Sequence, residues 1–203
     1  MRKFIYFCLA VVAVAFAGQI YFESHPRRDP LPVSGKIVCF GDSLTSGFGA
    51  TKGQTYPAQL ALMISRPVVN AGRSGDTTQS AANRLHTDVL NHSPNMVLLS
   101  LGANDLLRGI PEEVAFRNLK TMIQEIQDSG ALVIVGGVDV PIWGRGYGAM
   151  YQKLCRETGT DCVPNILDGI WGNHALMSDP IHPNDAGYKR MAEMFYQALK
   201  PYL

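Results

Sequence analysis

The sequence predicts an α/β fold in which helices cover both faces of a parallel sheet. Four short apolar runs, at residues 37–40, 68–69, 96–101 and 132–135, are spaced along the chain. Continuous apolar runs of this length are typical of parallel strands that are buried on both faces. Amphipathic helical patterns lie between these runs and after the last one. This repeated alternation favours a doubly wound α/β sandwich.

The composition is that of a globular protein. The chain has 203 residues, of which 46% are hydrophobic and 17% are charged, so it is long enough for one domain with a sizeable core. Its formal net charge is +1, so the chain lacks the excess of basic residues that is typical of nucleic-acid-binding domains. We therefore expect a single monomeric domain with no nucleic acid as a partner.

The N-terminal segment, residues 1–22, has the pattern of an export signal or a membrane anchor. Arg2 and Lys3 precede an uncharged run over residues 4–22. Small residues before Gly18 are typical of a signal-peptide cleavage site, whereas the length of the run is about that of a membrane span. An uncleaved run would anchor the chain in the inner membrane. Either alternative places the following domain on the periplasmic or extracellular side, and a buried core helix is the less favoured interpretation.

A linker is predicted to separate this segment from the domain. Residues 23–35 contain several charges together with Pro26, Pro30 and Pro32. Prolines at this density favour an irregular connection over a helix or strand. The globular domain is therefore expected to span residues 36–203.

Two helices are the clearest in the domain. In residues 111–129, Pro111 suits the first helical position and Gly130 suits the stop. The last helix is expected over residues 185–199. Each segment has apolar residues at helical spacing on one face. These residues are Ala115, Leu119, Met122, Ile123 and Ile126 in the first helix and Tyr188, Met191, Ala192, Phe195 and Leu199 in the second.

Ser43 lies in the first polar loop, Gly41-Asp42-Ser43-Leu44, directly after the first strand. Sites in open parallel sheets gather at the carboxyl ends of strands. A serine in this place is either a nucleophile or an N-terminal helix cap. We interpret Asp42 as structural support for the loop.

The second and third polar loops follow the next two strands. The second loop, residues 70–76, includes Gly75, where a backbone N–H can approach a ligand closely. The third loop contains Asn104, whose amide is a neutral hydrogen-bond donor suited to a developing oxyanion. Each loop taken alone is equally well explained as a plain turn.

The fourth block, Asp179-Pro180-Ile181-His182, precedes the last helix. An aspartate three residues before a histidine can bond one imidazole nitrogen and leave the other free as a base. Aspartate and histidine occur on many protein surfaces, so this spacing indicates a catalytic pair only when it is taken together with the other three blocks.

Together the four blocks resemble the GDSL/SGNH hydrolase family. The resemblance runs from Lys36 to the C-terminus, and residues 69–77 and 181–184 are most similar to its bacterial thioesterase, lysophospholipase and arylesterase branch. It implies a three-layer α/β/α sandwich around a five-stranded parallel sheet, with the flavodoxin-like SGNH hydrolase fold. It also implies a serine hydrolase that cleaves an ester or thioester.

The resemblance also implies the role of each site residue. Ser43 is the expected nucleophile, His182 the base and Asp179 the residue that orients it. The backbone N–H groups of Ser43 and Gly75 and the side chain of Asn104 form the expected oxyanion hole. No cofactor or metal is implied. Gly72 competes with Gly75 for the glycine role, and Gly75 is preferred because it directly precedes Asp76-Thr77.

Apolar residues after two of the strands are expected at the mouth of the site. They favour a small-molecule or lipid-like acyl ester, such as an aryl ester, a lysophospholipid or an acyl thioester, although such residues often serve only packing. A carbohydrate O-deacetylase of the same family and an anchored binding module without activity remain alternatives. The candidate substrate-binding residues are Leu106, Leu107, Ile142, Trp143 and Tyr147.

Three of the four cysteines lie in the domain. Cys39 falls in an apolar strand and is expected to be a small buried residue. Cys155 and Cys162 are close in sequence and could form a disulfide in an oxidising compartment.

Overall fold

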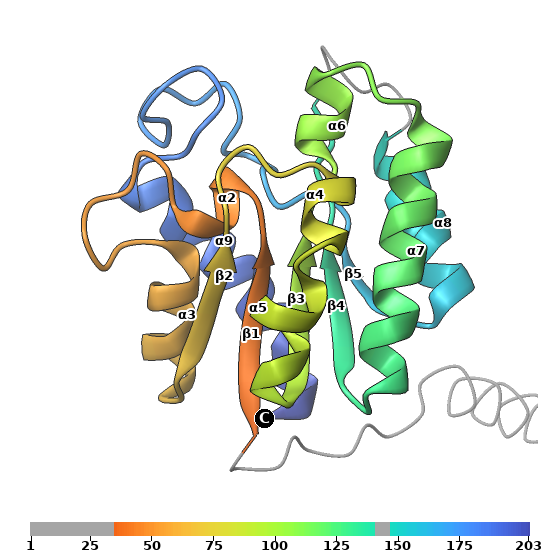
Figure 1. Cartoon of the computed structure of the whole chain (residues 1–203). Helices are drawn as coiled ribbons and strands as arrows, with labels where there is room; N and C mark the ends of the chain where they lie inside the picture. The colour runs from red at the N-terminus through yellow and green to blue at the C-terminus, as the bar shows by residue number, and fades with distance from the viewer. Residues whose placement is uncertain (1–34, 141–146) are drawn as a thin grey trace, which may run out of the picture. The chain divides into compact units, whose positions relative to one another are not determined.

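The computed structural model describes residues 35–140 and 147–203. They form a five-stranded parallel sheet in the order β2-β1-β3-β4-β5, which confirms the predicted fold class. Helices lie on both faces of this sheet (Figure 1). The strands are β1 (Lys36–Gly41), β2 (Val68–Gly72), β3 (Pro94–Ser100), β4 (Leu132–Gly136) and β5 (Asp161–Val163).

Alternation along the strands divides the buried side chains between the two faces. In β1, Val38 and Phe40 belong to the core cluster on one face, whereas Ile37 and Cys39 point to the other face. All four side chains are fully buried, as expected for a strand covered on both faces. The predicted burial of Cys39 is therefore confirmed.

Four helices cover the face that carries Val38 and Phe40. The amphipathic stripe predicted for residues 111–129 is buried in this core, which confirms it. Pro111 differs from its predicted place: with φ −54° and ψ 136° it precedes the helix as its N-cap, because its backbone is extended. The covering helices are α4 (Thr78–Ala82), α5 (Leu85–Asp88), α7 (Glu112–Asp128) and α8 (Tyr147–Thr158).

Two helices, α3 (Tyr56–Ile64) and α9 (Asp185–Leu199), pack together on the opposite face. The rings of Tyr56 and Phe195 stack with centroids 5.0 Å apart. The predicted apolar stripe of the last helix is buried here, and the helix has the predicted bounds. The shorter elements are α2 (Ser43–Ser46), η1 (Leu90–His92), α6 (Ala103–Leu107) and η2 (Lys200–Tyr202).

Register aligns the ends of the central strands. Gly41 at the end of β1 pairs with Gly72 on one side and with Ser100 on the other. The loops that follow β1, β2 and β3 therefore leave the sheet at the same edge, which is the upper edge in Figure 1. This order of strands places a ligand site outside the carboxyl edge.

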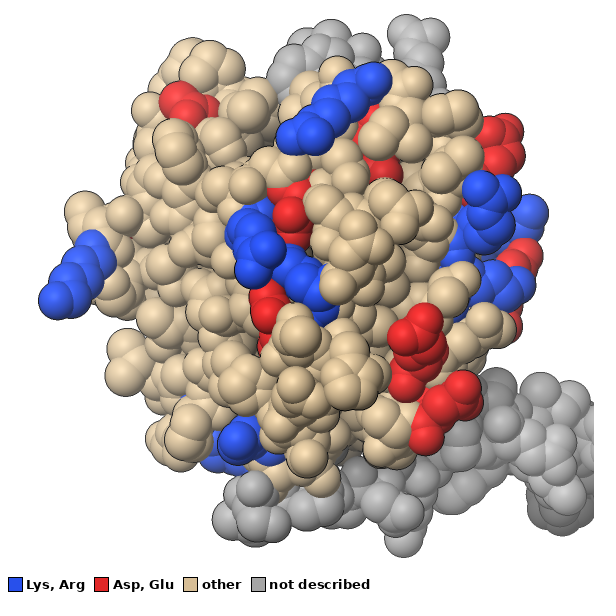
Figure 2. Space-filling model, in the orientation of Figure 1, with Lys and Arg blue, Asp and Glu red and all other residues tan. Residues whose placement is uncertain are grey.

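Charged side chains of both signs are interspersed over the face shown in Figure 2. An example of a surface pair is Lys120 with Glu157, whose charged atoms are 2.8 Å apart. Exposed pairs of this kind contribute little to stability.

The disulfide proposed from sequence is absent. Cys155 of α8 and Cys162 of β5 are neighbouring free thiols. The thiol of Cys162 donates to the carbonyl of Tyr151, 3.7 Å away. The spacing thus brought the two residues together correctly, but the expectation of a covalent bond was wrong for this structure.

The proposed export segment and all but the last residue of the linker lie outside the described residues. Within residues 35–140 and 147–203, every helix is too short or too polar to cross a bilayer.

Candidate active site

Ser43 occupies the first turn after β1. Asp42 caps α2 by accepting the N–H of Leu44 at 3.0 Å, and Gly47 ends the helix in the left-handed region at φ 86°. A side chain at position 41 would overlap Thr45 and the carbonyl of Ser100. The sequence Gly-Asp-Ser therefore permits a tight turn that leaves the serine hydroxyl in the pocket at the strand end.

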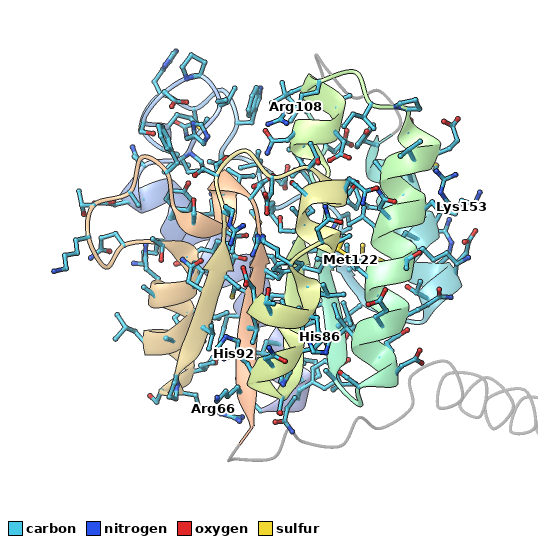
Figure 3. The ribbon with its side chains drawn as sticks, in the orientation of Figure 1. Arg66, His86, His92, Arg108, Met122 and Lys153 are labelled. Atoms are coloured by element: carbon cyan, nitrogen blue, oxygen red, sulfur yellow. The ribbon has the colours of Figure 1, made fainter. Side chains whose placement is uncertain are left out.

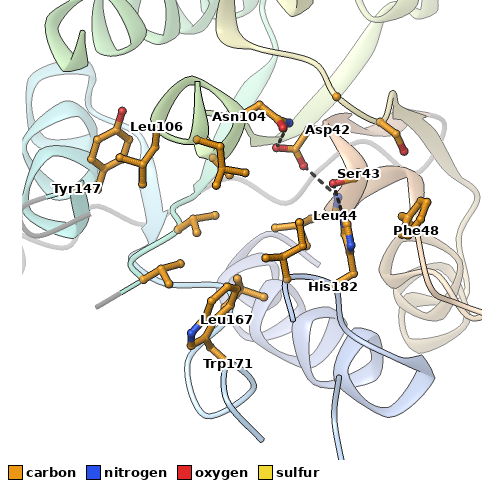
Figure 4. Close-up of a pocket in the computed structure, with 17 residues that line it drawn as sticks. Asp42, Ser43, Leu44, Phe48, Asn104, Leu106, Tyr147, Leu167, Trp171 and His182 are labelled. Carbon is orange, nitrogen blue, oxygen red and sulfur yellow. Dashed lines mark hydrogen bonds between the residues drawn. The ribbon is translucent and has the colours of Figure 1, made fainter. Parts of the chain in front are cut away.

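A hydrogen-bonded chain joins Ser43, His182 and Asp179. The Oγ of Ser43 is 3.0 Å from Nε2 of His182, and Nδ1 of His182 is 2.8 Å from Oδ2 of Asp179. Ser43 and His182 lie together along one side of a pocket, as Figure 4 shows. This is the order of contacts that lets an imidazole accept a proton from a serine hydroxyl.

The turn before α9 fixes the carboxylate of Asp179. Its Oδ1 accepts the N–H groups of Ile181 and His182, both at 2.8 Å. Burial alone would raise the pKa of this carboxyl, but the bonds from Ile181 and His182 hold its pKa below the ordinary value. The ionised carboxylate is thus favoured, and it favours a proton on the imidazole nitrogen that faces it.

Phe48 packs against the imidazole of His182. Its ring centroid is 4.5 Å from that of His182, although 54% of the residue is exposed. The hydroxyl of Tyr188 on α9 donates to the carbonyl of Phe48 at 2.7 Å. This bond ties the loop after α2 to the helix that follows His182.

The geometry separates the two candidate oxyanion glycines. The N–H of Gly72 donates to Oδ1 of Asn70 at 2.9 Å, and a side chain at position 72 would overlap the backbone of α2. Gly75 lines the pocket with φ 83°, a conformation that favours glycine. Within the described part of the chain, the N–H groups of Ser43 and Gly75 donate to no acceptor. Both are therefore available to a ligand oxygen.

Asn104 lies at the start of α6 and also lines the pocket. Its Nδ2 donates to the carbonyl of Asp76 at 2.9 Å and faces Oδ2 of Asp42 at 3.4 Å. Burial, helped by the nearby charges of Asp76 and Asp105, raises the pKa of Asp42 to about 7 against the bonds from backbone N–H groups. The donor side of the Asn104 amide is thus set toward the turn that carries Ser43.

The pocket beside Ser43 has a volume of about 230 Å³ and is lined mainly by apolar side chains. Leu106, Leu107 and Tyr147 line it, as the sequence predicted. Ile142 and Trp143 lie outside the described residues. Seven further apolar residues line the pocket that were not predicted as substrate-binding residues, namely Leu44, Phe48, Val138, Val140, Leu167, Trp171 and Ile181.

Two of these omissions had a usable signal. Val138 and Val140 follow the carboxyl end of β4, where the rule applied to the other strands would have placed them. Leu167 and Trp171 had no such signal, because they lie in an irregular segment between β5 and α9.

Titratable side chains outside the Ser43-His182-Asp179 chain lie at both ends of the sheet. His86 and His92 lie near the opposite end of the sheet, whereas Arg108 lies above the strand ends (Figure 3). Arg108 donates to the carbonyl of Gly75 at 2.7 Å. Among the residues that the structure describes, no group of three or more His, Cys, Asp or Glu side chains could hold a metal ion.

Comparison with known proteins places this geometry among ester hydrolases. Residues 39–190 match the model of the GDSL-like lipase/acylhydrolase family. An arylesterase of Vibrio mimicus is 34% identical over 84% of this chain and 90% of its own. The thioesterase 1/protease 1/lysophospholipase L1 of Escherichia coli K12 is 30% identical over 81% of this chain and 83% of its own.

A solved structure agrees with the sequence comparison. The crystal structure of TesA superposes with a TM-score of 0.78 at 31% identity, covering 83% of this chain and 99% of TesA.

Proposed function

Because the chain belongs to the GDSL-like lipase/acylhydrolase family and is a carboxylic ester hydrolase, we propose that it cleaves lipid-like or aryl acyl esters through an acyl-enzyme on Ser43. The observation that carries this proposal is the chain of contacts from Ser43 through His182 to Asp179, which opens on an apolar pocket. Acyl thioesters and lysophospholipids fit the same arrangement.

The proposed reaction has two acyl transfers. His182 takes the proton of Ser43 as Oγ attacks the carbonyl carbon, and Asp179 stabilises the imidazolium. The N–H groups of Ser43 and Gly75 and the amide of Asn104 stabilise the oxyanion. The imidazolium then protonates the leaving group. In the second transfer, His182 activates a water molecule that releases the acid and regenerates Ser43.

The pocket supports an acyl chain as the group that is recognised. Leu106, Val138, Val140 and Leu167 supply apolar contacts beside the hydrolytic residues. Burial of apolar surface contributes roughly 0.8 kcal/mol for each methylene group. An acetyl group could bury little of this surface, so the pocket favours longer acyl chains over the carbohydrate O-deacetylase alternative.

A series of nitrophenyl esters from acetyl to dodecanoyl tests the substrate class. We expect kcat/KM to rise from acetyl to a medium chain, roughly three- to fourfold for each methylene that enters the pocket. Preference for acetyl, together with release of acetate from an acetylated glycan, would favour the deacetylase instead. Absence of hydrolysis with all esters would favour the binding-module alternative.

We also propose that residues 1–22 direct the domain out of the cytoplasm, with residues 23–35 as the linker. The support is the pattern of charge and apolar residues in the sequence. A chain that begins at Pro32 should be folded and active on a soluble ester. Intact mass of the exported protein separates cleavage at Gly18 from retention as an anchor. An insoluble or inactive truncated chain would contradict the proposed boundary.

A further inference from the structure

Asp42 uses its two carboxyl oxygens in different directions. Oδ1 accepts the N–H of Leu44 at 3.0 Å and thereby caps α2, whereas Oδ2 faces Nδ2 of Asn104 at 3.4 Å. The residue is only 2% exposed. In Figure 4 its carboxyl group lies between Asn104 and the turn that carries Ser43. The side chain thus links the nucleophile turn to the third donor of the proposed oxyanion hole.

The capping role does not explain an aspartate at this position. A cap needs one acceptor oxygen, which asparagine or serine supplies equally well without a buried ionisable group. Among the described residues no lysine, arginine or histidine pairs with Asp42, whereas the neighbouring Asp76 is paired with Arg84 at 2.6 Å. The carboxyl is therefore buried without a compensating cation, and its second oxygen requires a separate explanation.

That explanation lies in the chemistry of Asn104. Its amide can be oriented with either the nitrogen or the oxygen toward the nucleophile turn, and only the nitrogen can donate to an oxyanion. The carbonyl of Asp76 and Oδ2 of Asp42 are both acceptors, so together they select the orientation with the nitrogen inward. The bond from Asn104 to the Asp76 carbonyl is the shorter, at 2.9 Å. The longer contact with Oδ2 of Asp42, at 3.4 Å, is therefore the one that an oxyanion can replace.

We propose that Asp42 is a positioning residue, whose second carboxyl oxygen holds the Asn104 amide with its donor toward the oxyanion hole and gives up that donor when the oxyanion forms. This inference rests on the proposed hydrolysis at Ser43. An ionised and a protonated carboxyl both keep a lone pair on the oxygen that faces Asn104, so the role holds in either state.

Asp42→Asn is the most direct variant. It keeps the shape and one acceptor for Leu44, but it replaces the second oxygen with an N–H₂ group that meets another donor at Asn104. We expect kcat for a nitrophenyl ester to fall by about 10- to 100-fold, because the full loss of an oxyanion donor costs about 10²–10³. KM should change by less than about threefold, because Asp42 acts on the transition state through Asn104.

A double-mutant cycle with Asn104→Ala measures whether the effects of the two substitutions on kcat are coupled. A purely structural role of Asp42 would not produce such coupling. If Asp42 acts through Asn104, adding Asp42→Asn to Asn104→Ala should lower kcat by no more than about twofold further. A further loss equal to that of Asp42→Asn alone would overturn the proposal, because Asp42 would then act on the Ser43 turn independently. An unchanged kcat in the single variant would overturn it as well.

Two further variants guard against misfolding and nonspecific effects. Asp42→Ser keeps a good cap, cannot reach Asn104 and adds no opposing donor, so it should fold and lose less kcat than Asp42→Asn. Asp185→Asn alters a carboxylate that accepts the N–H and hydroxyl of Thr51, both at 2.7 Å, and kcat should stay within about threefold. A loss from Asp185→Asn equal to that from Asp42→Asn would contradict the specific role.

The unaltered chain separates this inference from the proposed function. If it hydrolyses esters and Ser43 is labelled while the cycle is additive, only the role of Asp42 fails. If it hydrolyses no ester, the proposed function fails and the role of Asp42 is overturned with it.

Discussion

Arg84 is predicted to be the side chain whose loss most weakens the scaffold of the site. Its guanidinium bonds the carboxyl ends of β1 and β2 and is only 6% exposed. One arginine thereby joins β1, β2 and the loop before α4. Its partners are Oδ2 of Asp76 at 2.6 Å, the carbonyl of Ala71 at 2.9 Å, Oδ2 of Asp88 at 3.0 Å, the carbonyl of Gly41 at 3.0 Å and the ring of Phe40 at 4.4 Å.

The expected loss of stability in Arg84→Met depends on the two carboxylates that lose their cation. Asp76, with a side chain 8% exposed, would keep a buried charge without a cation, whereas Asp88, at 29%, can turn to water. Removing one partner of a buried ion pair costs about 3–5 kcal/mol. For a domain of this size that loss lowers Tm by roughly 10 °C.

Urea unfolding of the purified chain, followed by circular dichroism, measures the change. The urea concentration at the midpoint should be lower for Arg84→Met, whereas the dependence of the unfolding free energy on urea should be unchanged. That result would show that the stability of the fold has changed and the compactness of the unfolded chain has not. The matched control is Arg73→Met, because Arg73 is 62% exposed and, among the residues that the structure describes, forms an ion pair only with Asp88, at 3.1 Å. That control should cost less than about 1 kcal/mol. If Arg84→Met costs no more than Arg73→Met, the reasoning from burial and charge is refuted.

Three further outcomes are expected. Asn104→Ala should lower kcat by about 10²–10³ with a much smaller change in KM, and an unchanged kcat would return Asn104 to the role of a turn residue. Folding raises the pKa of Asp42 from 3.8 to about 7, so the folded chain binds the carboxyl proton more tightly than the unfolded chain. The stability that this proton provides is full below pH 3.8 and is lost as pH rises to about 7. Because asparagine does not ionise, the free energy of unfolding of Asp42→Asn should rise by on the order of 4 kcal/mol relative to that of the unaltered chain between pH 3.8 and about 7. The same pH dependence of the unfolding free energy in both chains would contradict this. Val138→Phe should narrow the pocket and lower kcat/KM for an octanoyl ester relative to an acetyl ester by roughly tenfold or more, and an unchanged ratio would remove Val138 from the acyl site.

The strands and helices that could be predicted are those whose apolar residues have a clear period. Strands β1 to β4 and the stripes of α7 and α9 were placed in this way. Strand β5 was not located, because it has three half-buried residues, Asp161–Val163, and one of them is charged. Its pairing with β4 supplies what its own sequence does not.

The candidate site was predictable where chemistry requires a residue type at a fixed place. The spacing of Asp179 and His182 and the loops at strand ends led to the side chains that the structure brings together. Trp171 on the pocket wall could not be predicted, because it lies in an irregular segment between β5 and α9 that has no periodic pattern. Cys155 and Cys162 show the same limit, since proximity in sequence did not establish a bond.

Covalent labelling of Ser43 tests most directly whether this residue is the nucleophile. A fluorophosphonate reacts with an activated serine to give a stable tetrahedral adduct, which intact mass and peptide mapping can locate. One adduct per chain on Ser43 is predicted, with loss of both the adduct and ester hydrolysis in Ser43→Ala and retention of both in Ser129→Ala, a surface serine at the end of α7. Substantial turnover by Ser43→Ala, or an adduct on another residue, would show that Ser43 is not the nucleophile.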